Sequence, residues 1–270
     1  MWVDPSEGIY ILDLTLNILQ RYDLETLTYI ESLQMPVVSP MSFAKLPGMD
    51  RYIYYKPAFN KGLPNDSTNQ LYIADSKGKV YTEYMPASPK GKVLHGDVRN
   101  FYVIDDMLRF YPHFSNQIWN IGSDTLDVAY ELTFGSNTMP ADELFDKYVS
   151  SGEIMREVMN EKNGWIRMIY VYETYSQILV KYYIGKDFYV AGYDKKSQKS
   201  FNFKAEDVID DVGLGGSFPL PIGVSQDKFV GILQPYEIDT ALIKDPRLKE
   251  LTQVISEEDN PILCIYTMQI

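Results

Sequence analysis

The chain has 270 residues, which is enough for one large all-β domain or for two ordinary domains. Its 37 Asp and Glu residues outnumber its 25 Lys and Arg residues, giving a net charge of −12. Nucleic acids and anionic membrane surfaces are bound by clustered Lys and Arg, so neither is an expected partner, and the simplest interpretation of the acidity is solubility. No stretch reaches the roughly 18 apolar residues of a membrane span.

Few residues are suited to metal or nucleophilic chemistry. The single cysteine, Cys264, lies in the apolar run 261–266 and is expected to be buried, and no intrachain disulfide can form. The only histidines are His95 and His113, which cannot build a zinc site of the usual Cys/His kind. The only glycine cluster, 213–216, lacks the lysine of a phosphate-binding loop. We therefore expect no metal and no cofactor.

Aromatic strand pairs joined by a polar turn recur along the chain. The four pairs are 9–13 with 18–23, 71–75 with 79–84, 118–122 with 126–132, and 188–192 with 199–203. Tyr10, Tyr72, Trp119 and Tyr189 mark equivalent positions, at spacings of 62, 47 and 70 residues. A four-stranded propeller blade takes about 40 to 50 residues, so the spacings fit blades with insertions. Each pair is interpreted as the outer half of a blade.

The repeats predict one all-β propeller domain over residues 1–270. Five blades are expected, at approximately 1–36, 37–90, 91–138, 164–206 and 214–270. The first has two interpretations. It is either a compact four-stranded blade that begins at Trp2, or the outer half of a blade whose inner half is missing.

Two helical insertions are predicted, near 139–162 and 245–257. In the first, Pro140 and the acids after it signal a helix start, and Gly152 is expected to divide the segment. In the second, Asp245 is expected to cap the helix, with Leu248, Leu251 and Ile255 on its packed face. A packing role is the expected role of both.

The segment 2–13 (Trp-Val-Asp-Pro-Ser-Glu-Gly-Ile-Tyr-Ile-Leu-Asp) resembles an NHL-type propeller repeat. More specifically, the chain resembles a large set of uncharacterised bacterial six-bladed β-propellers of the NHL/TolB-like kind, common in the Bacteroidetes. The marks are residues 130–135 followed by Met139-Pro140 and a helix, the segment 210–216, and the ending 258–263 with a final strand.

The resemblance implies six blades and an exported lipoprotein of the periplasm or cell surface. Members of the family begin with a lipoprotein signal peptide and a first blade carrying a Gly-Pro-Gly-Glu-Tyr-like turn. Neither motif is found in this sequence, and five blades are counted rather than six. The family supplies no established activity.

Three functions fit these observations. The favoured one is a non-enzymatic binding module for a glycan, a peptide or a partner protein at the mouth of the propeller channel. His95, Asp97 and Arg99 fall together before a strand and are the predicted ligand-binding residues. The second is a hydrolase or lyase using carboxylates such as Asp97, Asp105 or Asp106, with or without Ca²⁺. The third is a structural scaffold of a cell-surface complex.

Two further features have competing interpretations. Glu206, Asp207, Asp210 and Asp211 form an acidic loop that is expected to be solvated, with Ca²⁺ binding as the alternative. The 22 Tyr, 12 Phe and 3 Trp residues are expected to pack mostly between blades, with a carbohydrate-stacking surface as the alternative. Trp165 is the ring expected to be exposed, and 105–106 is expected to be a hairpin turn between two inner strands.

Overall fold

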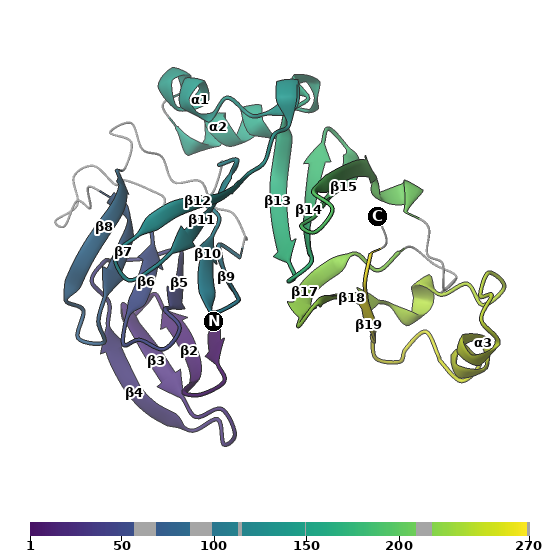
Figure 1. Cartoon of the computed structure of the whole chain (residues 1–270), viewed down its shortest axis with the longest axis horizontal. Coiled ribbons are helices and arrows are strands. Elements are labelled where there is room, and N and C mark those ends of the chain that lie inside the picture. Colours follow the sequence, from purple (N-terminus) through teal and green to yellow (C-terminus); the bar gives the residue numbers. More distant parts are fainter. Residues whose placement is uncertain (57–68, 87–98, 113–114, 149, 209–217, 269–270) are drawn as a thin grey trace. The chain divides into compact units, whose positions relative to one another are not determined.

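Strands dominate the computed structural model, which describes residues 1–56, 69–86, 99–112, 115–148, 150–208 and 218–268 (Figure 1). They form five antiparallel sheets, and in each sheet the strands lie side by side in sequence order. Strands in sequence order within each sheet are the topology of propeller blades, in agreement with the predicted all-β fold class. The chain divides into two compact units, Met1–Trp165 and Ile166–Ile270, and each is described separately.

The first unit contains three four-stranded sheets, followed by helices. The strands are β1 (Trp2–Asp4), β2 (Gly8–Asp13), β3 (Ile18–Tyr22) and β4 (Tyr29–Gln34); β5 (Ser42–Lys45), β6 (Tyr52–Tyr55), β7 (Asn69–Ala74) and β8 (Val80–Pro86); and β9 (Phe101–Ile104), β10 (Met107–Phe110), β11 (Gln117–Ile121) and β12 (Leu126–Glu131). The helices are η1 (Gly135–Asn137), α1 (Ala141–Lys147), α2 (Ser151–Val158) and η2 (Glu161–Asn163).

The second unit contains a four-stranded and a three-stranded sheet. Its elements are β13 (Ile166–Glu173), β14 (Gln177–Ile184), β15 (Asp187–Asp194), β16 (Lys199–Lys204), η3 (Ala205–Asp207), β17 (Pro221–Ser225), β18 (Lys228–Leu233), η4 (Pro235–Glu237), α3 (Pro246–Thr252) and β19 (Ile262–Tyr266). Among the described residues of both units, no helix has the length and apolarity that crossing a membrane requires.

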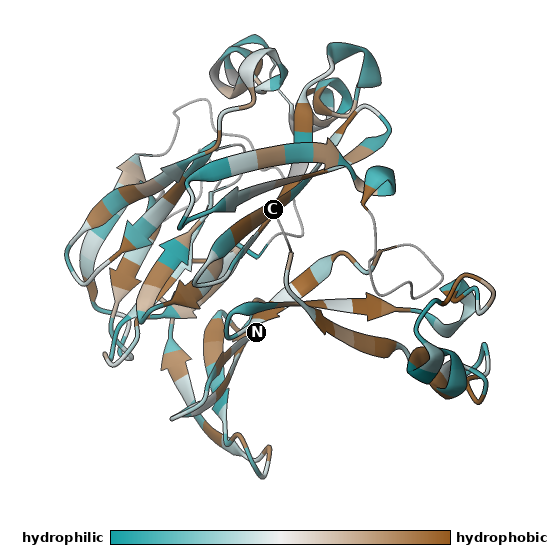
Figure 2. Ribbon diagram, turned by 45° about the vertical axis from the view of Figure 1, so that its right-hand side comes forward, coloured by the Kyte–Doolittle hydropathy of each residue, from teal (hydrophilic) through white to brown (hydrophobic). Residues whose placement is uncertain are grey.

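Alternation along the strands sends neighbouring side chains to opposite faces of a sheet, and hydrophobic and hydrophilic residues interleave along many strands (Figure 2). Strand β6 shows what happens when both faces are covered, because all four of its residues are buried. Tyr52 and Tyr54 pack into the core shared with β1–β4, whereas Ile53 and Tyr55 pack into the core shared with β9–β12. A strand buried on both faces is therefore apolar throughout.

The prediction that the first aromatic pair forms the outer half of a blade, like the other three pairs, is wrong. The first sheet has four strands and begins at Trp2, so the compact interpretation of the first blade is the one that the structure shows. The aromatic pair 9–13 and 18–23 therefore forms the middle strands β2 and β3, whereas the other three pairs are outer strands. Tyr10 is not equivalent to Tyr72, Trp119 and Tyr189. The inner strand β1 has only three residues, too few to show an alternating pattern.

The first helical insertion is present where the sequence predicts it, but Gly152 does not divide it. The break falls between α1 and α2, and Gly152 lies inside α2. Helix α2 begins after Ser150, whose hydroxyl accepts a hydrogen bond from the Glu153 amide while the Glu153 carboxylate accepts one from the Ser150 amide. This reciprocal capping box sets the start of the second helix. Leu144, Ile154 and Val158 are buried together.

The second predicted helix is α3. The Asp245 carboxylate accepts hydrogen bonds from the amides of Arg247 and Leu248, as expected of a cap. The predicted packed face is wrong in part, since Leu251 is 61% exposed and Thr252 is buried. Cys264 is only partly buried, because β19 is the last strand of a three-stranded sheet.

Residues 105 and 106 form the predicted turn, here between β9 and β10. Both have positive φ, at 52° and 56°, which is the backbone of a two-residue type I′ hairpin turn. Both side chains are exposed.

Gly192 provides a test of the packing within the second unit. It pairs with Phe201 across β15 and β16, and a Cβ at this position would meet the Phe201 ring at 1.9 Å. We expect Gly192→Ala to lower the free energy of unfolding by about 2 kcal/mol, because the added methyl overpacks the sheet face. Gly152 has no atom within 4 Å of its Cβ position, so Gly152→Ala should raise it by about 0.5 kcal/mol. Equal effects in urea unfolding would contradict this packing.

Candidate functional site

The predicted ligand-binding residues are only partly described. His95 and Asp97 lie outside the described residues, whereas Arg99 is exposed just before β9. This site stays a prediction. Among the other candidates, His113, residues 213–216, Asp210 and Asp211 also lie outside the described residues.

Of two further sequence features, the acidic loop is exposed at Glu206 and Asp207, as expected, whereas the environment of Trp165 differs from the expected one. Glu206, on η3, pairs with Lys204 at 3.7 Å, and within the described ranges no three His, Cys, Asp or Glu side chains gather as a metal site would require. Trp165 was expected to be exposed, but it packs partly buried against the apolar cluster of α1 and α2.

A pocket of about 400 Å³ lies in the second unit, between the sheet β13–β16 and the segment that leads into β17 and β18. This size suits a small molecule. We call it the Lys181 pocket. Its lining residues are Tyr170, Lys181, Tyr183, Phe188, Phe218, Pro219, Leu220, Ile222, Ile232 and Glu237. Four of the ten are aromatic and two carry charge, so the lining presents both aromatic rings and polar atoms.

Strand pairing explains how the rings and the lysine come together. In β14, Lys181 and Tyr183 are two residues apart and therefore project from the same face. Tyr170 pairs with Lys181 across β13 and β14, and Phe188 pairs with Tyr183 across β14 and β15. The Tyr183 and Phe188 rings stack with centroids 4.6 Å apart. The same face continues into the core around Leu179.

The Lys181 ammonium is held by a carbonyl oxygen and two aromatic rings. Its Nζ donates a hydrogen bond to the Pro221 carbonyl oxygen at 2.6 Å. The same atom lies 4.9 Å from the Tyr172 ring centroid and 5.5 Å from that of Tyr170, in the range of cation–π attraction. In the described part of the chain, no acidic side chain pairs with it. Burial disfavours the charged form and lowers its pKa to about 8.

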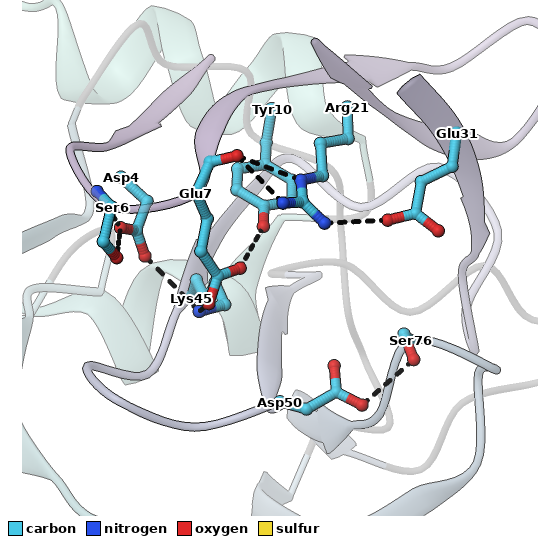
Figure 3. Close-up of polar contacts among 9 residues, drawn as sticks. All are labelled: Asp4, Ser6, Glu7, Tyr10, Arg21, Glu31, Lys45, Asp50 and Ser76. Carbon is cyan, nitrogen blue, oxygen red and sulfur yellow. Dashed lines mark hydrogen bonds and ion pairs between the residues drawn. The ribbon is translucent and has the colours of Figure 1, made fainter. Parts of the chain in front are cut away.

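Lys45 in the first unit shows the usual environment of a buried lysine (Figure 3). Its side chain is only 2% exposed, and its Nζ contacts Glu7 Oε1 at 2.6 Å and Asp4 Oδ2 at 3.4 Å. Burial acts to lower the Lys45 pKa, but the hydrogen bond and charge of Glu7, with those of Asp4, outweigh it and raise the pKa overall. The Tyr10 hydroxyl also donates to Glu7, at 2.7 Å. This network connects the β1–β2 turn to β5.

Partly buried Lys195 also has an acidic partner, since it donates to the fully buried carboxylate of Glu173 at 2.7 Å. Lys181 therefore differs from both Lys45 and Lys195, because no acid of the described ranges neutralises it. A desolvated, unneutralised cation in a pocket is a mark of a functional site, because the energetic cost of such a charge is offset when a ligand supplies the counter-charge. The sequence carried one signal that was missed, namely a lysine within the otherwise apolar run 178–184.

Glu237 is the only acid among the described lining residues, and its side chain is exposed. Its Oε2 accepts a hydrogen bond from the Gln234 amide at 2.9 Å, which ties the carboxylate to its own turn. Arg167 pairs with Tyr183 across β13 and β14, and its guanidinium donates to the Gly185 carbonyl oxygen. The pocket thus offers rings for stacking and one amine for a polar or anionic group.

Comparisons with known proteins agree with this fold. A family model described as "6-bladed beta-propeller" (DUF5128) matches residues 1–232. The crystal structure of a presumed exported protein from Bacteroides fragilis is similar, with a TM-score of 0.80 and 19% identity over 97% of this chain and 74% of that chain. At this identity the likeness shows the fold alone. No curated protein matches the chain. These findings confirm the resemblance predicted from the sequence.

Lys45→Met is expected to lower the free energy of unfolding by about 2 kcal/mol, because it removes charged hydrogen bonds from two acids. The hydrogen bond from Lys45 lowers the pKa of Glu7, and the Asp4 pKa is also lowered, since hydrogen bonds from Ser6 and Lys45 outweigh burial. The contribution should therefore be full near neutral pH and be lost as pH falls below about 4. Urea unfolding from pH 3 to 7 measures it. Lys77→Met, at an exposed turn, is the control. A pH-independent difference would contradict the network.

The lowered Lys181 pKa predicts a second gain of stability with rising pH, in an alkaline range. The folded chain releases this proton near pH 8, whereas the unfolded chain keeps it to about pH 10.5. The unfolded chain thus binds more protons between these values, so the wild type should gain stability relative to Lys181→Met as pH rises from 8 to 10.5. Paired urea titrations of the two proteins measure the difference. A flat difference over this range would show that the amine is solvated.

Proposed function

Because the chain belongs to the 6-bladed beta-propeller family DUF5128, in which the fold leaves the activity open, we propose that it is a non-enzymatic binding module that takes a saccharide in the Lys181 pocket. The observation that carries the proposal is a pocket of about 400 Å³ lined by four aromatic rings and a single amine. Among the glycan, peptide and protein ligands expected from the sequence, the glycan is favoured.

The aromatic rings and the amine of the pocket match the two kinds of surface that a sugar presents. The C–H face of a sugar is apolar and packs on aromatic rings, and its hydroxyl groups need hydrogen-bond partners at the edge of the contact. The stacked rings of Tyr183 and Phe188 supply the apolar surface, and Lys181 supplies a donor. An extended peptide is bound instead along an exposed strand edge, through a row of main-chain hydrogen bonds. The pocket is concave and small, which suits a compact ligand.

The alternative of a carboxylate-dependent hydrolase needs converging acids. Asp105 and Asp106 are exposed on a two-residue turn, and the described lining of the Lys181 pocket contributes one acid, Glu237, at the rim. The binding proposal needs no such convergence. An exported location suits it, since the similar crystal structure is that of a presumed exported protein and extracellular surfaces carry glycans.

Truncating the pocket rings tests the proposal. The chain is first screened against a panel of neutral and acidic oligosaccharides, and the best ligand is then titrated by calorimetry. Tyr183→Ala and Phe188→Ala should each weaken its affinity by about tenfold or more, because each removes an aromatic ring that lines the pocket. Tyr175→Ala is the matched control, since this ring is 53% exposed in the same unit and does not line the pocket. Thermal melting checks that each variant folds.

Two results would overturn the proposal. One is that no saccharide in the panel binds. The other is that binding occurs but is unchanged in the folded Tyr183→Ala and Phe188→Ala proteins, which would place the site elsewhere.

A further inference from the structure

The environment of the Lys181 ammonium indicates which charge a ligand of the pocket should carry. Its ammonium has three protons and, among the residues that the structure describes, makes one hydrogen bond, to the Pro221 carbonyl oxygen. The Tyr170 and Tyr172 rings stabilise the cation without removing its charge. The group is therefore oriented by its neighbours and has donors left for a ligand.

An anionic group gains more from this environment than a neutral hydroxyl does. A hydrogen bond between an ammonium and an anion is about twice as strong as one between neutral groups. Partial burial strengthens the attraction, because less water screens it than at the surface. A carboxylate or phosphate on the ligand would also supply the counter-charge that Glu7 and Asp4 supply to Lys45 and that Glu173 supplies to Lys195.

The surrounding charges limit how acidic the ligand can be. The chain has a net charge of −12, and Glu237 carries a negative charge at the rim. Both repel a polyanion, although salt screens charges farther apart than about 8 Å at physiological ionic strength. A ligand with one anionic group, placed at Lys181, meets the attraction and avoids most of the repulsion.

We propose that the Lys181 pocket binds a saccharide that carries a single anionic group, a sugar carboxylate or a sugar phosphate, with the anion on Nζ of Lys181 and the sugar face against the Tyr183–Phe188 pair. This inference rests on the proposed function and adds the ligand class. It makes binding pH-dependent, because Lys181 must be protonated. Among the described residues, the other titratable or charged groups on the elements around it are Tyr170, Tyr172, Tyr183, Arg167 and the rim acid Glu237.

Three disaccharides of matched size test the inference by calorimetry at pH 6.5. They are a glucuronyl-glucose, a 6-phosphorylated glucosyl-glucose and the neutral glucosyl-glucose of the same linkage. At least one acidic disaccharide should bind about tenfold or more tightly than the neutral one, the factor expected of one charged hydrogen bond. The order of the two acidic disaccharides identifies the carboxylate or the phosphate as the source of the anion. The advantage should be lost at pH 9.5, where the Lys181 amine is neutral.

Variants distinguish the effect of Lys181 on binding from the effect of the protein's overall charge. Lys181→Met and Lys181→Gln should both remove the advantage of the acidic disaccharides, and the second covers the case in which the first misfolds. Lys199→Met removes an exposed lysine of the same unit and should change nothing. Glu237→Gln should raise the affinity for the acidic disaccharides by about twofold to fivefold, because it removes a like charge at the rim.

The outcomes distinguish this inference from the proposed function. Equal binding of the neutral and acidic disaccharides overturns the inference and leaves the binding module intact. An acidic advantage that survives both Lys181 variants also overturns it. Absence of binding by all three disaccharides overturns the inference alone when another saccharide of the panel binds in the Lys181 pocket, whereas absence of binding by the whole panel overturns the proposed function as well.

Discussion

Face-to-face packing of antiparallel sheets is the constraint on which the rest of this structure depends. A sheet that packs on both faces must bury the alternate residues of each strand on both sides. Strand β6 meets this requirement with Tyr52–Tyr55, whose four side chains are all buried. A charged side chain in such an interface needs a group of opposite charge. Lys45 pairs with Asp4 and Glu7 of the neighbouring sheet.

Lys181 meets the same constraint in another way. It projects from the packed face of β14, beside the core around Leu179, but toward a pocket rather than toward an acid. A carbonyl oxygen and two tyrosine rings hold its ammonium in place. Partial burial of the charge costs stability, as its lowered pKa indicates. A fold that needed only stability would place an apolar residue here, and this is why the site is interpreted as functional.

Much of the fold could be predicted from the sequence, because propeller strands alternate and repeat. Aromatic alternation identified the strand pairs, and the Asp245-Pro246 signal identified helix α3. The first repeat was misassigned because β1 has only three residues, and the break between α1 and α2 depends on a side-chain capping box rather than on Gly152.

The Lys181 pocket was beyond sequence reasoning. A lysine in the run 178–184 is a visible anomaly, and alternation places it on the face of Tyr183. Which face is covered, however, depends on how residues 218–222 and β18 pack, some 40 positions further along the chain. The sequence around Lys181 does not show which distant segment will pack against this face of the sheet. The predicted ligand residues at 95, 97 and 99 remain a prediction about a different part of the chain.

The most direct test of the account is a crystal structure of the chain with the acidic disaccharide that binds most tightly. We expect the sugar in the Lys181 pocket, with an anionic oxygen about 2.8 Å from Nζ of Lys181 and the sugar ring against Tyr183 and Phe188. Electron density for the disaccharide at another surface, with the Lys181 pocket holding only solvent, would contradict it.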